Sequence, residues 1–572
     1  MICVHWRLLP IWLTVALLVV GCAPLATPTE MDASSGSTME EFATGAMLPG
    51  VFDVDVGPDG TVYVASELER ALIGVDPQSG AVVARHDTVN DTPHAMTMGP
   101  DGSLYWSSFF SLNVCRFDDA GEKTCQAMPV DTWGLDFAPD GRLFATADAH
   151  VESLYEVDPQ LDASPQHVAH LGSLIAHFAF GPDGKVYAPL LLEGTILRVD
   201  VDADPVSIET VAEGLTLPWA VAFDSSGQMY VAASADNDHN EILRLDPATG
   251  EREVVGRLPA GYHSIIFGAD DRLFASHFDE GALYELLPDG ELKAITEPGI
   301  TGPGGLAVLV RPDGGESLFV GGWNTLHELD AATGETRNHW RTTWFPGAVA
   351  PPRTVASHGD DLLIAKWADP SGRSSVQPWD PNNAEPLAQA GGFAWAANAI
   401  PFQDEIIVVD LFDGVWRVLR CAAADLTACE PIGGDTLKQP VGLAADEANL
   451  WATDYAGGTL AQLATDGAYL EEPLNVVSGL DRPEGLAIGP DGRLLVIETG
   501  TGRLLSVDPS TQDVETIAEG FEFQTENPTS IGPSGPPPHY VFSDVAVAPS
   551  GAIYVSDDGA NVIYRIPDPM VP

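Results

Sequence analysis

The sequence has 572 residues, with 83 Asp and Glu against 26 Lys and Arg, so its formal net charge is −57. Hydrophobic residues make up 45% of the chain, which excludes general disorder, because disorder combines low hydrophobicity with high net charge. A surface this acidic repels phosphate backbones, which excludes nucleic acid as a partner. The length allows two large β domains, and 57 Gly and 45 Pro indicate many turns.

Residues 1–21 are typical of a lipoprotein signal peptide. The apolar run over residues 8–20 is shorter than the roughly 20 residues that a membrane-spanning helix needs. Val19-Val20-Gly21-Cys22 resembles a bacterial lipobox, in which the cysteine takes the lipid and becomes the new N-terminus; a plain secretory signal is the alternative. Residues 22–37 form a flexible tether. We therefore expect a lipid on Cys22 to anchor the protein in a bacterial cell envelope, on the extracytoplasmic side of a membrane.

A repeat dominates the rest of the chain. Its unit is an apolar strand, a Gly-Pro-Asp-Gly-type turn and a second apolar strand, as in residues 51–66 and 485–498. A third strand with an Asp-Pro turn and a fourth strand follow, which is typical of a four-stranded antiparallel propeller blade. There are twelve such units, more than the usual four to eight blades of one ring. We predict an all-β protein of two tandem six-bladed β-propellers; rings of five and seven blades are the alternative.

The ends of the repeat indicate how the rings close. The last unit stops after its third strand, and residues 40–49 look like a surplus fourth strand. We predict that residues 40–49 complete blade 6 and that a strand over residues 291–296 completes blade 12. Each ring is then closed by its own N-terminal strand and has no exposed sheet edge. The first propeller is predicted over residues 38–289 and the second over residues 290–572.

The repeat resembles the six-bladed propellers of the senescence marker protein/gluconolactonase family and their NHL-repeat and streptogramin-lyase-like relatives. The resemblance covers nearly the whole chain after the tether, and its turn motif is specific for architecture. It implies that functional residues lie where the innermost strands begin, at one end of each central channel.

Four cysteines remain within the two rings. Cys115 and Cys125 flank one short turn, and Cys421 and Cys429 flank another, so each pair faces across a hairpin. We predict two disulfides; metal binding is the alternative.

Histidines and tryptophans gather at the predicted mouth of the first propeller. Counting from each turn glycine places the start of the inner strand opposite the end of the next strand. The count makes His263 and His277 neighbours, and converging imidazoles favour a divalent transition metal such as zinc. An aromatic channel lining or a ligand cleft is the alternative. The candidate metal ligands are His94, His177, His263 and His277, and the candidate ligand-binding residues are Trp133 and Trp219.

Carboxylates gather at the predicted mouth of the second propeller. The same count places Glu484 directly opposite Glu498, a pair that shares a proton or binds a cation. The resemblance implies that Glu484 takes the place of a metal-binding Asp and that Asn398 matches an Asn ligand. One divalent cation (calcium, or else zinc or magnesium), held by Glu484, Asn398 and Asp544, would polarise a lactone carbonyl and activate water.

The second ring also departs from the family's pattern. Gly302-Pro303-Gly304-Gly305 stands where the family has a Glu ligand. Strand-end carboxylates also commonly bind only the following turn, which is the alternative for Asp410, Asp454 and Asp557. An extra loop over residues 523–540 is predicted to be a lid; a plain surface insertion is the alternative. The candidate ligand-binding residues of this ring are Arg353, Lys366, His539 and Tyr540.

Three functions are compatible with these features. The sequence favours a binding module for a small-molecule or sugar ligand or a protein partner, because neither mouth holds a complete catalytic set. A metal-dependent lactone or ester hydrolase with Glu484 and Glu498 as catalytic residues is the second. A streptogramin-lyase-like enzyme is the third, because Thr92-Pro93-His94 resembles the lyases' entry motif, although acidic partners are missing from that mouth.

Overall fold

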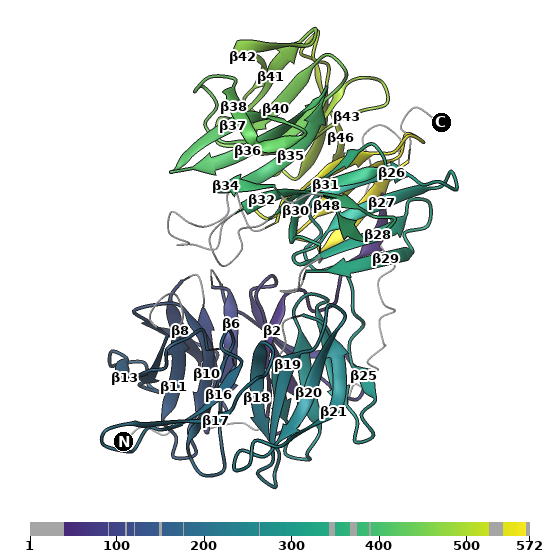
Figure 1. Ribbon diagram of the computed structural model, residues 1–572. Coiled ribbons are helices and arrows are strands. Elements are labelled where there is room, and N and C mark those ends of the chain that lie inside the picture. The colour runs from purple at the N-terminus through teal and green to yellow at the C-terminus, as the bar shows by residue number, and fades with distance from the viewer. Residues whose placement is uncertain are drawn as a thin grey trace, which may run out of the picture.

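The computed structural model describes residues 39–89, 91–108, 111–118, 120–147, 152–175, 177–261, 264–342, 349–366, 374–387, 390–525 and 541–567, with only the backbone described for 390–392. These residues form twelve antiparallel sheets, arranged as two rings that lie one above the other (Figure 1). The predicted tandem six-bladed β-propellers are confirmed. Within the described parts of the chain, we find no helix of the length and apolarity that crossing a bilayer requires.

The first propeller has six four-stranded blades whose strands follow one another in chain order. Its strands are β2 (Val51–Val56), β3 (Val62–Ser66), β4 (Ala71–Val75) and β5 (Val82–Asp87) in blade 1; β6 (Pro93–Met98), β7 (Leu104–Ser108), β8 (Asn113–Phe117) and β9 (Lys123–Ala127) in blade 2; β10 (Thr132–Phe137), β11 (Leu143–Ala147), β12 (Ser153–Val157) and β13 (Gln166–His170) in blade 3; β14 (Ala179–Phe180), β15 (Val186–Leu190), β16 (Thr195–Asp200) and β17 (Ser207–Ala212) in blade 4; β18 (Pro218–Phe223), β19 (Met229–Ser234), β20 (His239–Leu245) and β21 (Arg252–Pro259) in blade 5; and β22 (Ile265–Phe267), β23 (Leu273–His277), β24 (Ala282–Leu286) and β25 (Leu292–Ala294) in blade 6.

The second propeller repeats this plan, with an extra paired segment in blade 8. Its strands are β26 (Leu306–Val310), β27 (Glu316–Gly321), β28 (Thr325–Asp330) and β29 (Thr336–Arg341) in blade 7; β30 (Pro352–His358), β31 (Asp361–Lys366), β32 (Ser374–Asp380), β33 (Glu385–Pro386) and β34 (Ala390–Phe393) in blade 8; β35 (Ala396–Phe402), β36 (Glu405–Phe412), β37 (Val415–Ala422) and β38 (Asp425–Ile432) in blade 9; β39 (Pro440–Ala445), β40 (Leu450–Asp454), β41 (Thr459–Thr465) and β42 (Ala468–Ser478) in blade 10; β43 (Pro483–Ile488), β44 (Leu494–Glu498), β45 (Arg503–Val507) and β46 (Val514–Glu519) in blade 11; and β47 (Val545–Val547), β48 (Ile553–Asp557), β49 (Val562–Ile566) and β1 (Glu40–Thr44) in blade 12.

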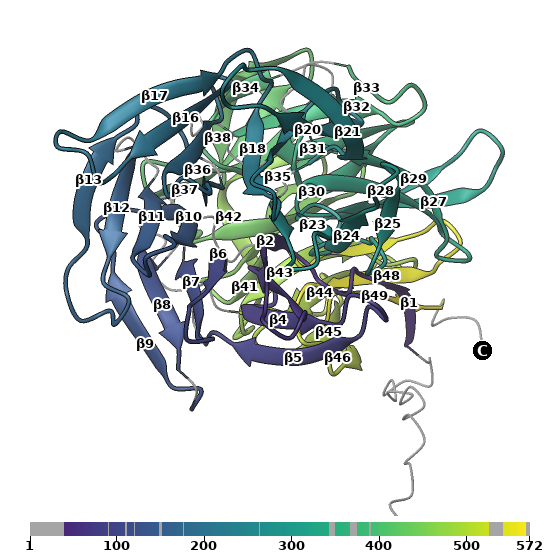
Figure 2. The ribbon, with the colours of Figure 1, turned by 90° about the horizontal axis from the view of Figure 1, so that it is seen from below.

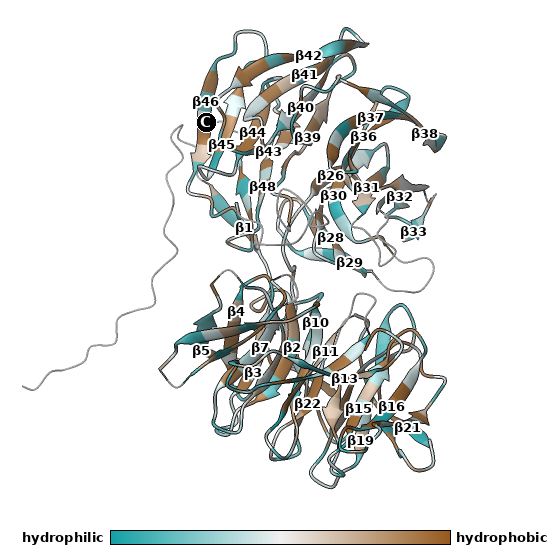
Figure 3. Ribbon diagram, turned by 90° about the vertical axis from the view of Figure 1, so that its left-hand side faces the viewer, coloured by the Kyte–Doolittle hydropathy of each residue, from teal (hydrophilic) through white to brown (hydrophobic). Residues whose placement is uncertain are grey.

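Both rings close through their innermost strands. In the first ring β22 lies beside β2, and in the second β47 lies beside β26, so six inner strands surround each channel. Figure 2 shows the first ring with its blades arranged around the central axis. The core lies between neighbouring blades, as where Val54 and Val64 of blade 1 pack against Phe274 and Leu283 of blade 6. In Figure 3 apolar residues follow the strands of both rings, as buried strands require.

The turn motif has a direct structural reason. In blade 1 the Gly60 amide donates to the Gly57 carbonyl at 2.9 Å, and Gly60 has a φ of 83°, which a side chain would disfavour. Asp59 Oδ1 accepts the Thr61 amide at 3.0 Å and so fixes the corner from within. The turn therefore uses its acidic residue for local geometry, and much of the chain's negative charge is of this kind.

The two closing strands are exchanged relative to the prediction. Strand β1 pairs with β49 in blade 12, and β25 pairs with β24 in blade 6, whereas the sequence assigned each to the other ring. Both assignments are wrong, and the predicted boundary after residue 289 separates β25 from the blade that it completes. The physical reason is local: β25 can form a hairpin with β24 directly, and only blade 12 lacks a fourth strand.

This exchange makes the first propeller an insertion into the second. The chain starts in blade 12, crosses to build the whole first ring, and returns to begin blade 7. The two crossing segments lie side by side, since the Ala46 amide donates to the Ile300 carbonyl at 2.8 Å. Asn561 of blade 12 binds both, because its Nδ2 donates to the Ala46 carbonyl at 2.8 Å and its Oδ1 accepts the Gly302 amide at 3.3 Å.

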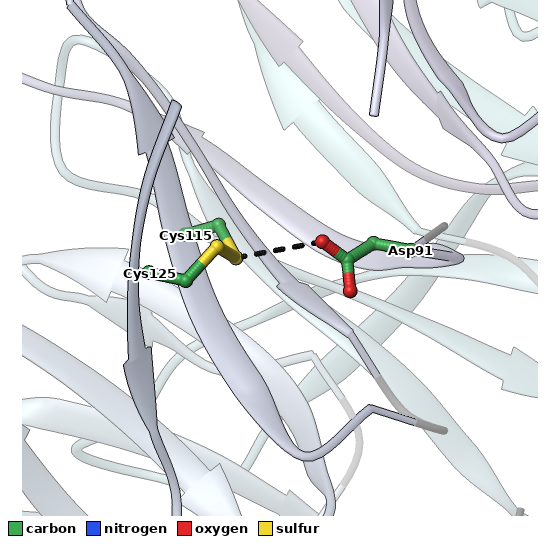
Figure 4. A group of neighbouring side chains, drawn as sticks. All are labelled: Asp91, Cys115 and Cys125. Carbon is green, nitrogen blue, oxygen red and sulfur yellow. Dashed lines mark hydrogen bonds between the residues drawn. A yellow bond between two sulfur atoms is a disulfide. The ribbon is translucent and has the colours of Figure 1, made fainter. Parts of the chain in front are cut away.

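The two predicted disulfides are confirmed. Cys115 and Cys125 join β8 to β9 and lie next to Asp91 (Figure 4), whose Oδ2 is 3.8 Å from Cys115 Sγ. Cys421 and Cys429 join β37 to β38. Because the sulfurs are bonded to each other, the group of Asp91 with these two cysteines is not a thiolate metal site. Disulfides of this kind persist in oxidising compartments outside the cytoplasm.

Candidate functional site

The mouths of the two channels lie on the faces by which the propellers meet. The loop Phe278-Asp279-Glu280, which follows β23 in the first ring, contacts blade 7 of the second ring. The Phe278 and Trp323 rings are 6.1 Å apart, and Asn324 Nδ2 donates to Asp279 Oδ1 at 2.7 Å. Both partners belong to loops at the end of the ring where inner strands begin, so the two candidate mouths are held together by this contact.

Glu280 is the charged centre of the contact between the propellers. Its side chain is 7% exposed and accepts from Arg341 Nε at 3.0 Å, while His339 Nε2 lies 3.4 Å away. Tyr284 donates its hydroxyl to the other carboxylate oxygen at 3.1 Å. Burial alone would raise the pKa of Glu280, but the charges of His277 and Arg341 and the hydrogen bonds from His339 and Arg341 hold it below its usual range. Glu280 therefore stays ionised, and its ion pair with Arg341 links the two rings.

Aromatic side chains fill the mouth of the first channel. Phe52 stacks on His94 with 3.6 Å between ring centroids and contacts Trp133 at 5.8 Å. It also contacts His177 at 5.2 Å and Phe278 at 5.7 Å. Phe52 is 8% exposed and His94 4%. This aromatic cluster matches the alternative that the sequence left open, a packed lining of the channel.

Carboxylates accompany the histidines of this mouth, so the expectation that acidic partners are missing is wrong. Glu67 Oε1 binds His94 Nδ1, and Asp53 Oδ1 lies 3.3 Å from His177 Nδ1. Burial would raise the pKa of Asp53, but the charge and hydrogen bond of His177 lower it. Glu67 directly follows Ser66, the strand end that the count identifies in blade 1. Glu280 lies three residues beyond His277, the corresponding strand end in blade 6. Extending the count into these loops would have found both carboxylates.

The described histidines do not meet as a metal-ligand set. Among the described residues, three ligand atoms lie within 4.8 Å of one another only at the disulfide beside Asp91 and in an exposed turn containing His239. His277 Nε2 instead lies 3.2 Å from the Ala260 carbonyl, and its Nδ1 accepts the Glu280 amide at 3.2 Å. Trp219, a candidate ligand-binding residue, is 3% exposed and donates its Nε1 to Ser234 at 3.0 Å.

Buried carboxylates bridge neighbouring inner strands below this mouth. Asp53 accepts the Met96 amide of the next blade at 2.8 Å, and Asp136 accepts the Phe180 amide at 3.2 Å. Burial raises the pKa of Asp136 to about 7, and the charges of Asp55 and Asp53 add to the shift. Burial likewise raises the pKa of Asp55 to about 6. Inner strands of neighbouring blades belong to different sheets, and these carboxylate–amide hydrogen bonds link them.

We expect Asp136→Asn to change the pH dependence of stability. A raised pKa means that the stabilising contribution of Asp136 is complete below about pH 4 and is lost as the pH rises towards 7. The variant should therefore gain unfolding free energy relative to the wild type between pH 5 and pH 8, by at most about 1.4 kcal/mol per pH unit. Urea unfolding at the two pH values measures this difference.

Asp140→Asn in the same blade is the control for this titration. The backbone hydrogen bond from Arg142 lowers the pKa of Asp140, so this carboxylate is ionised in both the folded and the unfolded state between pH 5 and pH 8. The control should show the same difference from the wild type at pH 5 and pH 8. An equally constant difference for Asp136→Asn would contradict the prediction.

The predicted pairing of Glu484 with Glu498 is wrong. A β-bulge at the start of β43 places Pro483, not Glu484, opposite Glu498. Glu498 binds Arg503, whose Nε lies 3.0 Å from Oε2, and accepts the Asp481 amide at 2.9 Å. Burial would raise the pKa of Glu498, but hydrogen bonds from Thr501, Asp481 and Arg503 lower it. The two carboxylates therefore do not form a shared acid–base pair.

Two of the three residues implied as ligands of a divalent cation, Asn398 and Asp544, hydrogen-bond to the backbone. Asn398 donates its Nδ2 to the Val441 carbonyl at 3.0 Å. Both oxygens of Asp544 accept backbone amides at 2.9 Å, from Leu306 and Val545. Burial raises the pKa of Asp544 to about 7, with a further contribution from the charge of Glu484. Asp544 thus bridges inner strands as Asp136 does in the first ring.

A buried guanidinium accompanies Glu484 instead. Arg353 is 4% exposed, and Glu484 is fully buried. Burial lowers the pKa of Arg353 to about 10, while the charge of Glu484 opposes that shift. Burial raises the pKa of Tyr455 to about 12, and Glu484 adds to the rise. At the second mouth Glu484 therefore lies near a cation, Arg353, and a phenol, Tyr455, which belong to two other blades. Lys366, at the end of β31, is partly exposed.

The strand-end aspartates of the second ring accept backbone amides; Asp454 and Asp557 bind the following turn, through the amides of Gly457 at 3.0 Å and Ala560 at 3.1 Å, as the alternative expected. Asp410 accepts the Trp395 amide at 2.8 Å and pairs with Arg417. Asp454 accepts the Gln439 amide at 2.8 Å, and Asp557 accepts the Glu522 amide at 2.7 Å. Four predicted site residues lie outside the described residues: Cys22, His263, His539 and Tyr540.

No protein-family model and no curated protein matches the chain. Solved structures do match. A streptogramin B lyase is 14% identical with a TM-score of 0.36, over 49% of this chain and 93% of that chain. A putative gluconolactonase is 13% identical with a TM-score of 0.34, over 47% and 95%. The extracellular domain of a putative one-component system from B. thetaiotaomicron is 12% identical with a TM-score of 0.32, over 94% and 83%. Both families that the repeat resembles, the streptogramin lyases and the gluconolactonases, occur among these matches, and the likeness concerns the fold.

Proposed function

We propose that this protein is an extracytoplasmic, lipid-anchored binding module whose second propeller holds a sugar or another small polar ligand at its mouth. The observation that carries the proposal is that two buried groups of opposite charge, Arg353 and Glu484, lie near enough at this mouth to act on each other electrostatically. Trp395, Lys366 and Tyr455 at the same end of the ring are partly exposed. A few fixed polar groups beside aromatic surfaces are typical of small-molecule sites.

Binding is favoured over hydrolysis because the carboxylates needed for chemistry are already bonded. Glu498 is committed to Arg503, and Asp544 to two backbone amides. A general acid–base pair needs carboxylates that can reach a substrate and exchange protons. In the first ring Phe52 of the aromatic cluster contacts His94 and His177, and each histidine already pairs with a carboxylate. The proposal therefore assigns recognition, not turnover, to the second mouth.

The anchor is part of the proposal. Cys22 would carry the lipid, and the two disulfides suit the oxidising side of the membrane. Cys22→Ser should then release the protein from the membrane fraction, because one anchoring signal is lost.

Titration of the detergent-solubilised full chain with gluconate and glucuronate, followed by tryptophan fluorescence, tests the proposal. We expect saturable binding of at least one of them, weakened at least tenfold by Glu484→Gln and by Lys366→Gln. Glu498→Gln, which removes a charge bonded to Arg503, is the matched control and should bind normally. Glucono-δ-lactone should not be hydrolysed with or without calcium or zinc. Metal-dependent turnover that Glu484→Gln abolishes would establish the hydrolase instead.

A further inference from the structure

A groove of about 700 Å³ lies at the far end of the first ring, away from the second propeller and its mouth. It follows the seam between blades 6 and 1 and is lined by the turns Gly57–Thr61, Asp76–Gln78 and Ala269–Asp270. Tyr63 and Phe274 line it as well. We call it the seam groove. Its volume is that of pockets which hold small organic molecules.

At two other seams a tyrosine of one blade donates a hydrogen bond to a backbone carbonyl of the next blade. Between blades 2 and 3, the Tyr105 hydroxyl donates to the Pro159 carbonyl at 2.9 Å. Between blades 12 and 7, Tyr554 binds the Ala331 carbonyl in the same way. Blade 6 has Phe274 at this position, which has no hydroxyl to donate.

One long hydrogen bond across the seam at that level comes from Arg272 of blade 6. Arg272 Nη2 lies 3.4 Å from the Pro77 carbonyl, which takes the place of Pro159 in blade 3. In the first ring, blade 1 and blade 6 each consist of consecutive strands, so no strand from one end of the ring's sequence completes the blade at the other end. The two blades pack against each other in the core, and the groove lies between their turns at this end of the ring.

The groove is acidic at its rim and apolar inside. Asp59, Asp76 and Asp270 come from three different turns around it. The one guanidinium in the lining, that of Arg272, is neutralised by Glu285, whose two oxygens accept from it at 2.7 and 2.8 Å. Apolar side chains line the groove between these turns: Tyr63, Val56 and Ala84 are partly exposed, Val83 is exposed, and Phe274 is buried beneath them.

We propose that the seam groove binds a linear aliphatic polyamine. Its separated ammonium groups match carboxylates that stand on different turns, and its methylene segments match the apolar interior. An ammonium group over the Tyr63 ring would gain a cation–π contact. A site for organic cations on a chain of net charge −57 is also favoured by long-range attraction. The groove shares no residue with the site of the proposed function.

Isothermal titration of the full chain with spermidine at low ionic strength tests the inference. We expect one saturable site, weakened roughly tenfold or more by the double variant Asp76→Asn/Asp270→Asn. Asparagine keeps the oxygen that accepts the Gln78 amide at 2.7 Å, so the turn is preserved. Ala84→Phe, which fills the groove without changing charge, should weaken binding as well.

The closed seam between blades 2 and 3 supplies the matched control. Asp101 and Asp158 occupy the positions of Asp270 and Asp76 there, beside the Tyr105 bond. Asp101→Asn/Asp158→Asn removes the same charge and should leave the affinity for spermidine within about twofold. Equal weakening by both double variants would mean attraction by bulk charge alone, and absence of saturable binding would overturn the inference outright.

Discussion

Replacing Glu280 by Gln is expected to lower the free energy of unfolding by roughly 3–5 kcal/mol. The substitution removes one charge from a buried ion pair and leaves Arg341, 17% exposed, without its counter-ion. Tyr284 and His339 lose the same acceptor charge. Because these groups belong to both rings, the change acts on the junction between them. Urea unfolding, followed by tryptophan fluorescence, measures the loss.

Glu40→Gln is the control for this substitution. Glu40 also pairs with an arginine, Arg565 at 2.9 Å, but its side chain is 50% exposed. Exposed pairs contribute at most about 1 kcal/mol, so this variant should resemble the wild type. If Glu280→Gln proves as mild as Glu40→Gln, the junction does not depend on the buried charge.

Deleting residues 1–45 is expected to destabilise the second propeller and leave the first nearly unchanged. The deletion removes β1, whose Phe42 packs with Tyr554 at 5.1 Å between ring centroids. It also exposes the edge of β49. Loss of a packed Phe alone costs about 3–5 kcal/mol, which corresponds to a fall of roughly 10 °C in the midpoint of a domain of this size. Differential scanning calorimetry should show this shift in one of two transitions.

Limited proteolysis identifies the transition that shifts. New cleavage should appear in blades 7 to 12 and not in blades 1 to 6. A variant that lacks only residues 1–38 retains β1 and should unfold like the full chain. If the deletion to residue 45 lowered the stability of blades 1 to 6 instead, the exchange of closing strands would be contradicted.

The sequence was sufficient for the architecture because each blade carries its own signal. The turn around Gly60 needs a positive φ and an acidic corner, and the same turn recurs in most blades, as at Gly102 and Gly492. Counting repeats therefore predicts twelve blades, whereas their division into two rings of six was argued from the closing strands. The blades to which β1 and β25 belong could not be predicted in this way. Both are short fourth strands, and only the strand with which each one pairs distinguishes them.

The candidate site was harder to predict for two physical reasons. First, a bulge near the start of an inner strand shifts the pairs beyond it by one residue, and Glu484 loses its place opposite Glu498. Second, the carboxylates that pair with histidines at the first mouth come from loops. Glu67 and Glu280 reach their histidines because the loops fold back over the channel, which no strand periodicity encodes.

The insertion of the first propeller into the second also fixes an order of assembly. A chain that emerges from its N-terminus presents β1 first, yet the partner of β1, β49, comes more than 500 residues later. At about 5–20 residues per second, β1 waits on the order of half a minute or more. The first ring has all its strands in one continuous stretch and can close during that interval. The earliest strand to appear is thus the last to find its place, and it makes its final pairing across a finished domain.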